Sequence, residues 1–404
     1  MAGIVIVGGG QAGFSAASTL RKFKYDEEIM LICDELSIPY QRPPLSKKFL
    51  LGDIPKERLF FRPMSYYKEN KIDVKCGVEA TKIDRESQTL VIGKQKILSY
   101  DRLILTTGAI PNKFPKRVGG QLRGVYYLRS IRDVERISLE LKATKHVLIV
   151  GGGYIGLEIA AVARRKKLKV TLVEAESRIL KRVASDSTAS YLRQLHIKEN
   201  VRILEGVSVE KLEGEKGYLS SAVLNNGDKF KVDFAIVGIG VIPNTKLASD
   251  AGLDLDNGIK VDTFCQTSDP NILAAGDCTS FPYNNRRIRL ESVGNAIEQG
   301  EKAAMTVLGR RQPYIARPWF WSDQYETKLQ IAGLSDLFDM VVERKNKESV
   351  SFWYYNKDKL IAVDAINDGR AYMIGKTLIE NGVSPSPSLL SDVNLNLKLL
   401  LKRI

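Results

Sequence analysis

The sequence predicts an α/β fold that contains two Rossmann-type dinucleotide-binding domains followed by a smaller α+β domain. Two apolar, β-branched runs, at residues 3–7 and 146–150, each lead directly into a glycine-rich turn. From about residue 317 onward the pattern changes to alternating strands, which is typical of an antiparallel sheet. The length of 404 residues is sufficient for two or three domains, each with its own core.

The two glycine-rich turns share the spacing GxGxxG and lie where a predicted strand meets a predicted helix. In that setting the glycines allow backbone N–H groups to approach a pyrophosphate at the N-terminus of the helix. One copy alone is weak evidence, because a glycine turn can also merely pack a helix against a strand. Two copies in the correct setting predict that the chain binds two dinucleotides. The residues predicted to line these turns are Gly8, Gly10, Ala12 and Gly13 in the first and Gly151, Gly153, Ile155 and Gly156 in the second.

The first turn opens a βαβ unit, with a helix predicted at residues 12–23 and a second strand at residues 29–33. Asp34 follows that strand, where a carboxylate can accept hydrogen bonds from an adenosine ribose. The proline-rich residues 39–47 are predicted to form an ordered loop that leads into a helix. A further buried strand is predicted at residues 103–108.

The second turn repeats this plan, with a helix predicted at residues 155–165 and a strand at residues 170–173 that ends at Glu174. A carboxylate at this position suits the free 2′-hydroxyl of NAD and repels the 2′-phosphate of NADP. Two nearby arginines, Arg178 and Arg182, argue in the other direction. The balance predicts NADH as the second dinucleotide.

Two similar segments, residues 108–112 and 240–244, lie at the ends of buried strands predicted at residues 103–108 and 234–240, and they are predicted to be the crossings between two domains. A short strand is predicted at residues 272–276, and Asp277 follows it. The carboxylate of Asp277 is predicted to bind polyol hydroxyls, and a helix cap is the alternative.

The C-terminal part is predicted to be an α+β domain. Strands at residues 352–355 and 360–363 flank a turn, and a helix follows at residues 371–380. The entry to this domain holds Trp319 and Trp321, which fit either core packing or an aromatic lid.

Cysteine and histidine usage excludes several classes of site. None of the four cysteines lies at metal-ligand or CxxC spacing, so reduced thiols are predicted and a structural disulfide is not. With two histidines in the whole chain, a histidine-rich metal site is excluded and a Ser-His-Asp or Cys-His mechanism is disfavoured. No metal is therefore predicted, and both histidines are expected to be structural. The residues concerned are Cys33, Cys76, Cys265, Cys278, His146 and His196.

The chain carries 61 basic and 47 acidic residues, which gives a formal net charge of +14. Such a charge can attract nucleic acid, an anionic membrane surface or an acidic protein. No nucleic-acid motif accompanies it, and the basic run at residues 164–167 fits the end of a helix. An acidic protein partner is therefore favoured. No stretch is long enough to span a membrane and no secretion signal is evident, so a cytoplasmic location is expected.

Six sequence blocks occur together in order and carry a resemblance to a known family. The blocks are RPPLSK at residues 42–47, GGGYIGLE at 151–158, GVIPN at 240–244, AGDC at 275–278, ESVGNAIEQ at 291–299 and WFWSDQ at 319–324. Through them the sequence resembles the FAD- and NADH-dependent ferredoxin reductases of bacterial oxygenase systems nearly from end to end. This resemblance implies a fold like that of glutathione reductase, with an FAD domain at residues 1–110 and 246–316, an NAD domain at 111–245 and a third domain at 317–404.

The resemblance implies which residues hold FAD. The first glycine turn binds its pyrophosphate, Asp34 its adenosine ribose, and Arg42 and Lys47 approach it from the proline loop. The other implied contacts are Ala80 through its backbone on the adenine side, Arg129 beside the flavin, Asp277 on the ribityl chain and Val293 near the ring.

The resemblance also implies the catalytic residues. Lys47 and Glu158 match a pair near flavin N5 that positions groups and manages protons, and Trp321 stands by the isoalloxazine face. The second dinucleotide site is expected to include, besides its glycine turn, Glu158, Glu174, Arg182 and Gly240.

The implied function is electron transfer from NADH through FAD, one electron at a time, to an acidic [2Fe–2S] ferredoxin that feeds a monooxygenase or dioxygenase. One alternative is an NADH oxidase or quinone-type reductase. Another is a flavoprotein resembling apoptosis-inducing factor that binds nucleic acid, although neither nucleic acid nor a membrane is expected as a partner. Disulfide reductases need two closely spaced thiols and a C-terminal histidine, which this chain lacks. Cys33, which precedes Asp34, is misplaced for an NADH peroxidase and is expected to serve packing.

Overall fold

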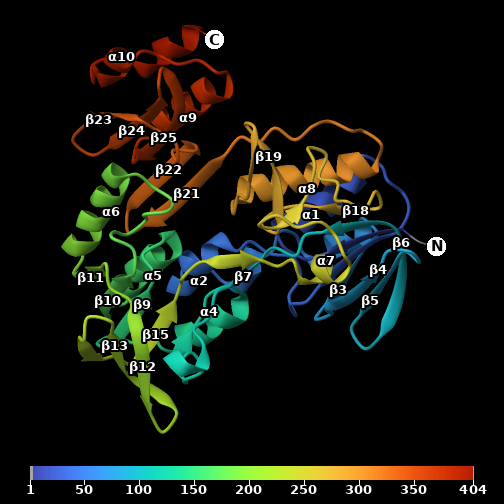
Figure 1. The fold of residues 1–404 in the computed structure, drawn as a ribbon, viewed down its shortest axis with the longest axis horizontal. Coiled ribbons are helices and arrows are strands. Elements are labelled where there is room, and N and C mark those ends of the chain that lie inside the picture. The colour runs from blue at the N-terminus through green and yellow to red at the C-terminus, as the bar shows by residue number, and fades with distance from the viewer. Residues whose placement is uncertain (1–2, 404) are drawn as a thin grey trace. The chain divides into compact units, whose positions relative to one another are not determined.

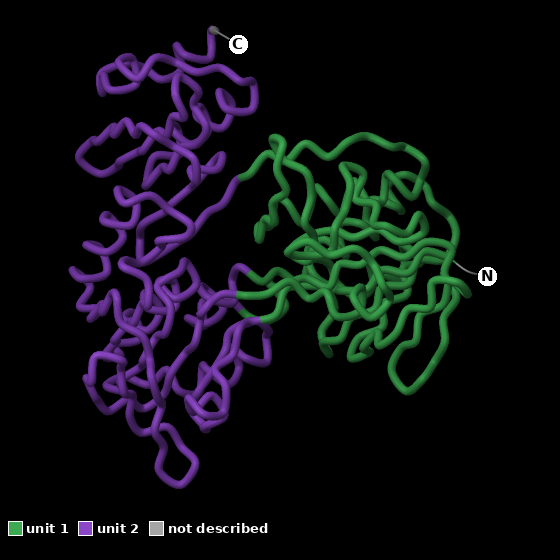
Figure 2. Tube along the Cα trace, viewed as in Figure 1, with its two compact units in different colours: residues 1–42, 55–110, 241–318 green, residues 43–54, 111–240, 319–404 purple. Residues whose placement is uncertain are grey.

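The computed structural model describes residues 3–403, and its internal contacts divide the chain into two compact units (Figures 1 and 2). The first unit comprises residues 1–42, 55–110 and 241–318, and the second comprises residues 43–54, 111–240 and 319–404. Each unit is thus assembled from three separate segments of the chain. The domain boundaries expected from the sequence stay a prediction.

The first unit is built on a seven-stranded sheet with the order β3-β2-β1-β6-β5-β4, in which β18 also pairs with β6. Strands β3, β2, β1, β6 and β18 run parallel, whereas β4 and β5 extend the sheet by antiparallel pairing. A small three-stranded sheet, β17-β19-β20, and a two-stranded ribbon, β7-β16, complete the strands. The bounds are β1 Gly3–Val7, α1 Gln11–Lys22, β2 Ile29–Cys33, α3 Met64–Glu69, β3 Ile72–Cys76, β4 Ala80–Asp84, β5 Thr89–Ile92, β6 Lys96–Leu105, β7 Ala109–Pro111, β16 Val241–Pro243, α7 Lys246–Asp250, β17 Ile259–Lys260, β18 Ile272–Ala274, β19 Thr279–Tyr283, β20 Arg286–Ile288 and α8 Val293–Val307.

Strand β1 shows why a strand in the parallel part of this sheet can be apolar along its whole length in the sequence. All of its residues are buried, because both faces of the sheet are covered. Ile4 and Ile6 belong to the core that includes residues of α1 and α8, whereas Val5 and Val7 belong to the core on the opposite face. The two helices also pack against each other (Figure 1).

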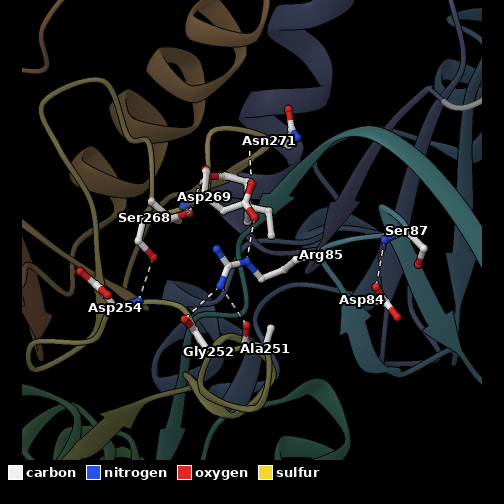
Figure 3. A network of polar contacts seen from close by, with 11 residues as sticks. Asp84, Arg85, Ser87, Ala251, Gly252, Asp254, Ser268, Asp269 and Asn271 are labelled. Atoms are coloured by element: carbon white, nitrogen blue, oxygen red, sulfur yellow. Dashed lines mark hydrogen bonds and ion pairs between the residues drawn. The ribbon is translucent and has the colours of Figure 1, made fainter.

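An ion pair connects two loops of the first unit (Figure 3). Arg85, which follows β4, donates from Nε to Asp269 Oδ2 at 2.8 Å, and its Nη1 donates to the carbonyls of Ala251 and Gly252 beyond α7. Asp269 is buried and also accepts from the backbone N–H of Asn271, at the start of the loop that leads into β18. One arginine thus holds three segments together.

We expect Arg85→Ala to lower the free energy of unfolding by about 1–3 kcal/mol, because it leaves the buried Asp269 carboxylate without its cation. Urea unfolding followed by circular dichroism measures this loss. Lys82→Ala removes an exposed cation from β4 and serves as the control, with an expected change within about 0.5 kcal/mol. Equal losses in the two variants would contradict this account of Arg85.

The second unit contains a five-stranded parallel sheet with the order β11-β10-β9-β15-β8 and a three-stranded antiparallel sheet, β12-β13-β14. Two short elements from the proline-rich segment, the 3₁₀ turn η1 and helix α2, also belong to it. The bounds are η1 Pro43–Ser46, α2 Lys48–Leu51, β8 Val125–Tyr126, α4 Ile131–Ser138, β9 His146–Val150, α5 Tyr154–Arg165, β10 Lys169–Glu174, α6 Asp186–Lys198, β11 Val201–Glu205, β12 Val209–Glu215, β13 Tyr218–Leu224, β14 Lys229–Lys231 and β15 Phe234–Val237.

The C-terminal part of the second unit is a five-stranded antiparallel sheet, β21-β22-β25-β24-β23, with α9 packed on it. Gly375 of α9 allows close packing, since a Cβ there would lie 2.5 Å from a methyl group of Val363. The bounds are β21 Trp319–Gln324, β22 Thr327–Gly333, β23 Met340–Lys345, β24 Val350–Asn356, β25 Lys359–Ile366, α9 Gly369–Glu380, α10 Pro387–Ser391 and the 3₁₀ helix η4 Leu397–Arg403.

The predicted α/β class, with two Rossmann-type units and a C-terminal α+β part, is confirmed. The structure differs from the sequence predictions at the ends of two strands. The strand predicted at residues 103–108 is the last part of the longer β6, and the strand predicted at residues 234–240 stops at Val237. In both cases the glycines that follow the apolar run adopt turn geometry, with positive φ at Gly108 and Gly240.

Candidate functional site

The first glycine turn, residues 8–13, connects β1 to α1, and three of its four glycines are required by the packing of the chain itself. Gly8 has a φ of +119°, and a Cβ there would lie 2.1 Å from the carbonyl oxygen of Thr106. A Cβ on Gly13 would lie 2.0 Å from the carbonyl oxygen of Gly8, so helix α1 rests directly on the turn. At Gly10, by contrast, a Cβ would have no described non-neighbouring atom within 4 Å. The turn is therefore closed on the protein side and open at Gly10.

The second glycine turn, residues 151–156, has the same geometry between β9 and α5. Gly151 has a φ of +105°, and a Cβ there would lie 2.3 Å from the carbonyl oxygen of Gly238. A Cβ on Gly156 would lie 2.0 Å from the carbonyl oxygen of Gly151, whereas Gly153 faces open space. The two glycine-rich sequences thus adopt the same turn geometry in the structure.

Both turns fit the pyrophosphate of a dinucleotide. Gly10 and Gly153 are the N-cap residues of α1 and α5, and neither helix has a side-chain cap. The first backbone N–H groups of each helix are thus left to an external acceptor, and the helix dipole favours an anion there. The open space at the two glycines lets such an anion approach the backbone closely.

Carboxylates lie at the carboxyl ends of the second strand in both units. Asp34 is exposed just beyond β2, while Glu35 accepts hydrogen bonds from Tyr40 Oη and Arg42 Nη2, both at 2.6 Å. In the second unit Glu174, at the end of β10, accepts from the backbone N–H of Gly152 at 2.6 Å and from that of Glu176 at 2.8 Å. Glu174 is therefore fixed directly beside the second glycine turn.

A third polar position in the first unit follows β18, where Asp277 is half-buried. The turn before it is anchored by Gln299 of α8, whose Oε1 accepts from the N–H of Gly276 and from Thr279 Oγ1, both at 2.8 Å. Val293 begins α8, whose N-cap is Ser292. Sequence reasoning missed the anchoring role of Gln299, although this residue ends one of the blocks that carry the resemblance.

The predicted pair Lys47 and Glu158 forms a buried ion pair in the second unit. Lys47 Nζ lies 2.8 Å from Glu158 Oε2, and the glutamate side chain is 3% exposed. The two residues come from the proline-rich segment and from α5, which η1 contacts. The same carboxylate accepts hydrogen bonds from Ser46 Oγ at 2.5 Å and from Ser322 Oγ at 2.6 Å. Glu158 is thus held by one cation and two hydroxyl groups.

This hydrogen-bonded network continues away from the ion pair into the C-terminal sheet. Gln324 Nε2 donates to Ser322 Oγ at 3.1 Å, and Gln324 Oε1 lies 2.8 Å from Nε2 of His196 on α6. The other ring nitrogen of His196 lies 3.2 Å from Tyr325 Oη. His196 therefore has a structural role, as the sequence predicted, and it is fully buried in α6.

Burial is the main cause that lowers the pKa of His196 to about 4 from the ordinary value of 6.5, and the hydrogen bond that the imidazole donates to Gln324 Oε1 opposes this shift. Above pH 6.5 the histidine is neutral in both the folded and the unfolded chain. As the pH falls toward 4, the unfolded chain takes up a proton that the folded chain does not. Stability is therefore lost on acidification, by up to about 3 kcal/mol at this one residue.

We expect His196→Gln to lose less stability than the parent between about pH 7.5 and about pH 5, by about 2 kcal/mol. Asp364 opposes this trend in both proteins, since burial raises its pKa to about 6 and the folded chain gains its proton first. Because the contribution of Asp364 to the pH dependence is the same in both proteins, it cancels when their stabilities are compared. Urea unfolding at the two pH values makes the measurement, and parallel pH profiles would contradict the assignment.

The remaining predicted residues lie as follows. The backbone N–H of Arg129 donates a hydrogen bond to the carboxylate of Asp133. The same carboxylate accepts from the backbone N–H of Ser130, as part of the capping box at the N-terminus of α4. Trp321 is half-buried on β21, and its ring stacks on that of Trp319 with centroids 5.5 Å apart. Two further residues meet at the second turn, where the guanidinium of Arg182 lies 3.4 Å from where a Cβ on Gly240 would be. Ala80 opens β4 and is half-buried, and Ile155 is exposed in the first turn of α5.

Neither a metal centre nor a membrane helix is found in the part of the chain that the structure describes. Among residues 3–403, no group of three or more His, Cys, Asp or Glu residues is arranged to hold a metal ion. Within the same range, no helix is long and apolar enough to cross a lipid bilayer. All four cysteines are free thiols.

Comparisons with known proteins agree with this geometry. Residues 2–300 match the model of the pyridine nucleotide-disulphide oxidoreductase family, and residues 319–401 match the reductase C-terminal family. Rhodocoxin reductase of Rhodococcus erythropolis is 38% identical over 99% of this chain and 94% of its own length. Putidaredoxin reductase of Pseudomonas putida is 37% identical over 98% of this chain and 96% of its own.

A solved structure described as the covalent putidaredoxin reductase-putidaredoxin complex matches with a TM-score of 0.96 and 36% identity, and the match covers 100% of this chain and 98% of that one. The resemblance stated from the sequence is confirmed. The chain belongs to the pyridine nucleotide-disulphide oxidoreductase family.

Proposed function

We propose that this protein is an NADH-dependent ferredoxin reductase, which binds FAD at the first glycine turn and NADH at the second. It passes electrons singly to an acidic [2Fe–2S] ferredoxin that feeds a monooxygenase or dioxygenase. The observation that carries the proposal is the pair of open glycine positions, Gly10 and Gly153, each at an uncapped helix N-terminus. The full-length similarity to two reductases named for their redox partners supports the choice of acceptor.

The residues of the first unit fit the binding of FAD. We assign the pyrophosphate to the turn formed by Gly8, Gly10, Ala12 and Gly13, and the adenosine ribose to Asp34. Asp277 lies at the end of β18, and we assign it to the ribityl chain. Arg42, Ala80 and Val293 complete the proposed FAD contacts of this unit, and we assign Arg129, which belongs to the second unit, to a position beside the flavin.

When bound, FAD accepts a hydride from NADH and releases its electrons one at a time, as an iron–sulfur protein requires. The task of the chain is to supply a fixed cation near the reduced cofactor. Lys47 is such a cation, because Glu158 holds its ammonium group in place. Ser46 and Ser322 also donate hydrogen bonds to the carboxylate of Glu158, so the position of this carboxylate does not depend on Lys47 alone. A positioned cation in a partly buried site stabilises negative charge more than it would in water.

The second unit fits NADH better than NADPH. Glu174 is held by two backbone N–H groups beside the turn, so its charge stays where the adenosine ribose is expected. A fixed carboxylate there accepts ribose hydroxyls and repels a 2′-phosphate. We assign Gly151, Gly153, Ile155 and Gly156 to the pyrophosphate, and Arg182 and Gly240 to the opposite wall. Trp321 we assign to the face of the flavin ring.

The partner and location follow from charge and thiol chemistry. A net charge of +14 favours rapid association with an acidic protein. Four free thiols are typical of a reducing compartment, so we propose a cytoplasmic location.

Stopped-flow spectroscopy tests the proposed function. The FAD-loaded protein is mixed with NADH or NADPH, and then with candidate [2Fe–2S] ferredoxins or cytochrome c. We expect NADH to reduce the flavin faster than NADPH and one ferredoxin to accelerate reoxidation. Rapid turnover with oxygen or a quinone and no response to any ferredoxin would instead indicate an oxidase or quinone-type reductase. Salt-sensitive retention of DNA at physiological ionic strength would indicate a nucleic-acid-binding flavoprotein.

A further inference from the structure

Two cysteines that are far apart in the sequence lie side by side in the first unit. Cys33 is the last residue of β2 and Cys76 is the last residue of β3, and the two are paired in register across the parallel strands. Paired residues on neighbouring strands project from the same face, and the strands lie about 4.8 Å apart. A disulfide requires a Cα separation of about 4.4–6.8 Å, so this spacing allows the bond without a rearrangement of the sheet.

The surroundings of the two thiols make them unequal. Cys33 is 2% exposed, and its hydrogen bond to Cys76, its burial and the nearby charges of Asp34 and Glu35 all raise the pKa of its thiol. Cys76 is half-buried and accessible, and the hydrogen bond from Cys33 lowers the pKa of Cys76 to about 7 although burial opposes the shift. Cys76 is therefore the thiolate of the pair, and Cys33 keeps its proton.

One more buried polar group lies beside this pair. Tyr67, on helix α3, is fully buried, and within residues 3–403 its hydroxyl has no hydrogen-bond partner. Burial is the main cause that raises the pKa of Tyr67, with contributions from both Cys33 and Cys76. The hydroxyl is thus a neutral donor close to the two sulfur atoms. An oxidised sulfur, such as a sulfenate, could accept the hydrogen bond that this hydroxyl does not make.

The pair also lies next to the first glycine turn. A Cβ on Gly9 would lie 2.3 Å from Cys33 Sγ, so the sulfur packs directly against the backbone of the turn. Asp34 and Glu35 follow Cys33 immediately in the chain. Any movement of the Cys33 sulfur toward Cys76 therefore changes the packing beneath this turn.

We propose that Cys33 and Cys76 form a redox-active thiol pair that hydrogen peroxide converts into a disulfide. The Cys76 thiolate attacks one oxygen of peroxide: an S–O bond forms, the O–O bond breaks, and the departing hydroxide takes a proton to become water. The Cys33 thiol then attacks the sulfur of the resulting sulfenic acid, which forms the S–S bond and releases a second water. Two thiols and one peroxide thus yield one disulfide and two waters.

The disulfide step does not depend on the proposed function, but its consequence does, because it concerns bound FAD. Closing the bond draws the Cys33 sulfur away from Gly9. We therefore expect the oxidised protein to release FAD faster than the reduced protein.

Treatment of the purified protein with hydrogen peroxide, followed by alkylation and peptide mass spectrometry, tests the first step. We expect a peptide that links Cys33 to Cys76, and a rate of thiol loss that rises with pH at a lower pH than is usual for a free thiol. Cys76→Ser should abolish the link and the rapid thiol loss. Cys265→Ser, which changes a fully buried thiol elsewhere in the unit, should leave both unchanged.

The first step is overturned if the parent protein yields no Cys33–Cys76 peptide, or if Cys76 proceeds to sulfinic acid with Cys33 still alkylated. Because this measurement uses the parent protein, it remains decisive even if a variant fails to fold. The release of FAD, followed by its fluorescence, tests the consequence. Equal release rates from oxidised and reduced protein would overturn the link to the glycine turn while leaving the proposed function intact.

Discussion

Gly10→Val is expected to weaken the binding of FAD substantially while leaving the fold intact. A Cβ at this position would meet no atom of the described chain beyond its neighbours, and the backbone is extended, with φ −82° and ψ −165°, which valine tolerates. The added methyl groups therefore occupy only the space that the pyrophosphate needs. We expect a loss of about 1–3 kcal/mol, or roughly tenfold to a hundredfold in affinity. The measurement is a titration of the apoprotein with FAD followed by flavin fluorescence.

Gly153→Val is the matched control, because Gly153 has the same open geometry at the second turn. This variant should bind FAD normally and raise the apparent Kd for NADH by a similar factor. As apoproteins, both variants should unfold at the same urea concentration as the apo form of the parent, because bound FAD would itself stabilise the parent. If Gly10→Val instead weakened NADH binding, or if both variants lost stability, the assignment of one dinucleotide to each turn would be wrong.

Lys47→Met is expected to slow the reduction of bound FAD by NADH, by roughly tenfold to a hundredfold, because a fixed cation is removed from the site. The variant should retain FAD, since the first glycine turn is unchanged. Glu158 should remain in place because Ser46 and Ser322 still donate to its carboxylate. Single-turnover reduction in a stopped-flow instrument measures the rate directly.

Lys48→Met controls for the loss of a positive charge at the adjacent position. Lys48 is exposed and begins α2, so its replacement should leave the rate of flavin reduction unchanged. The role assigned to Lys47 would be refuted by unchanged single-turnover kinetics in Lys47→Met, or by an equal loss in both variants.

The parts of the site that the sequence predicts are those defined by local chain geometry. A glycine turn between a strand and a helix requires particular residues within six positions, so Gly8 to Gly13 and Gly151 to Gly156 stand out without any knowledge of the tertiary fold. The same holds for Asp34 and Glu174, because Asp34 follows and Glu174 ends a strand whose apolar pattern is plain.

What the sequence did not predict depends on contacts between distant segments. Ser322 and Gln324 reach Glu158 and His196 only because β21 folds against α5 and α6 within the second unit. Serine and glutamine at those positions carry no local signal of such a contact.

The pairing of Cys33 with Cys76 depends likewise on the order and register of β2 and β3. The two cysteines lie outside any CxxC spacing, and sequence reasoning assigned Cys33 to packing alone. Their position as the last residues of β2 and β3 was a usable signal. It becomes informative only once those strands are known to be neighbours.

The central claim is that FAD at the first turn is reduced by NADH held at the second, and an anaerobic NADH titration of the purified protein tests it most directly. The account predicts a yellow protein whose flavin absorbance is bleached by stoichiometric NADH and restored by a [2Fe–2S] ferredoxin. A protein that stays colourless after incubation with FAD, or whose bound flavin is not reduced by NADH, would contradict it.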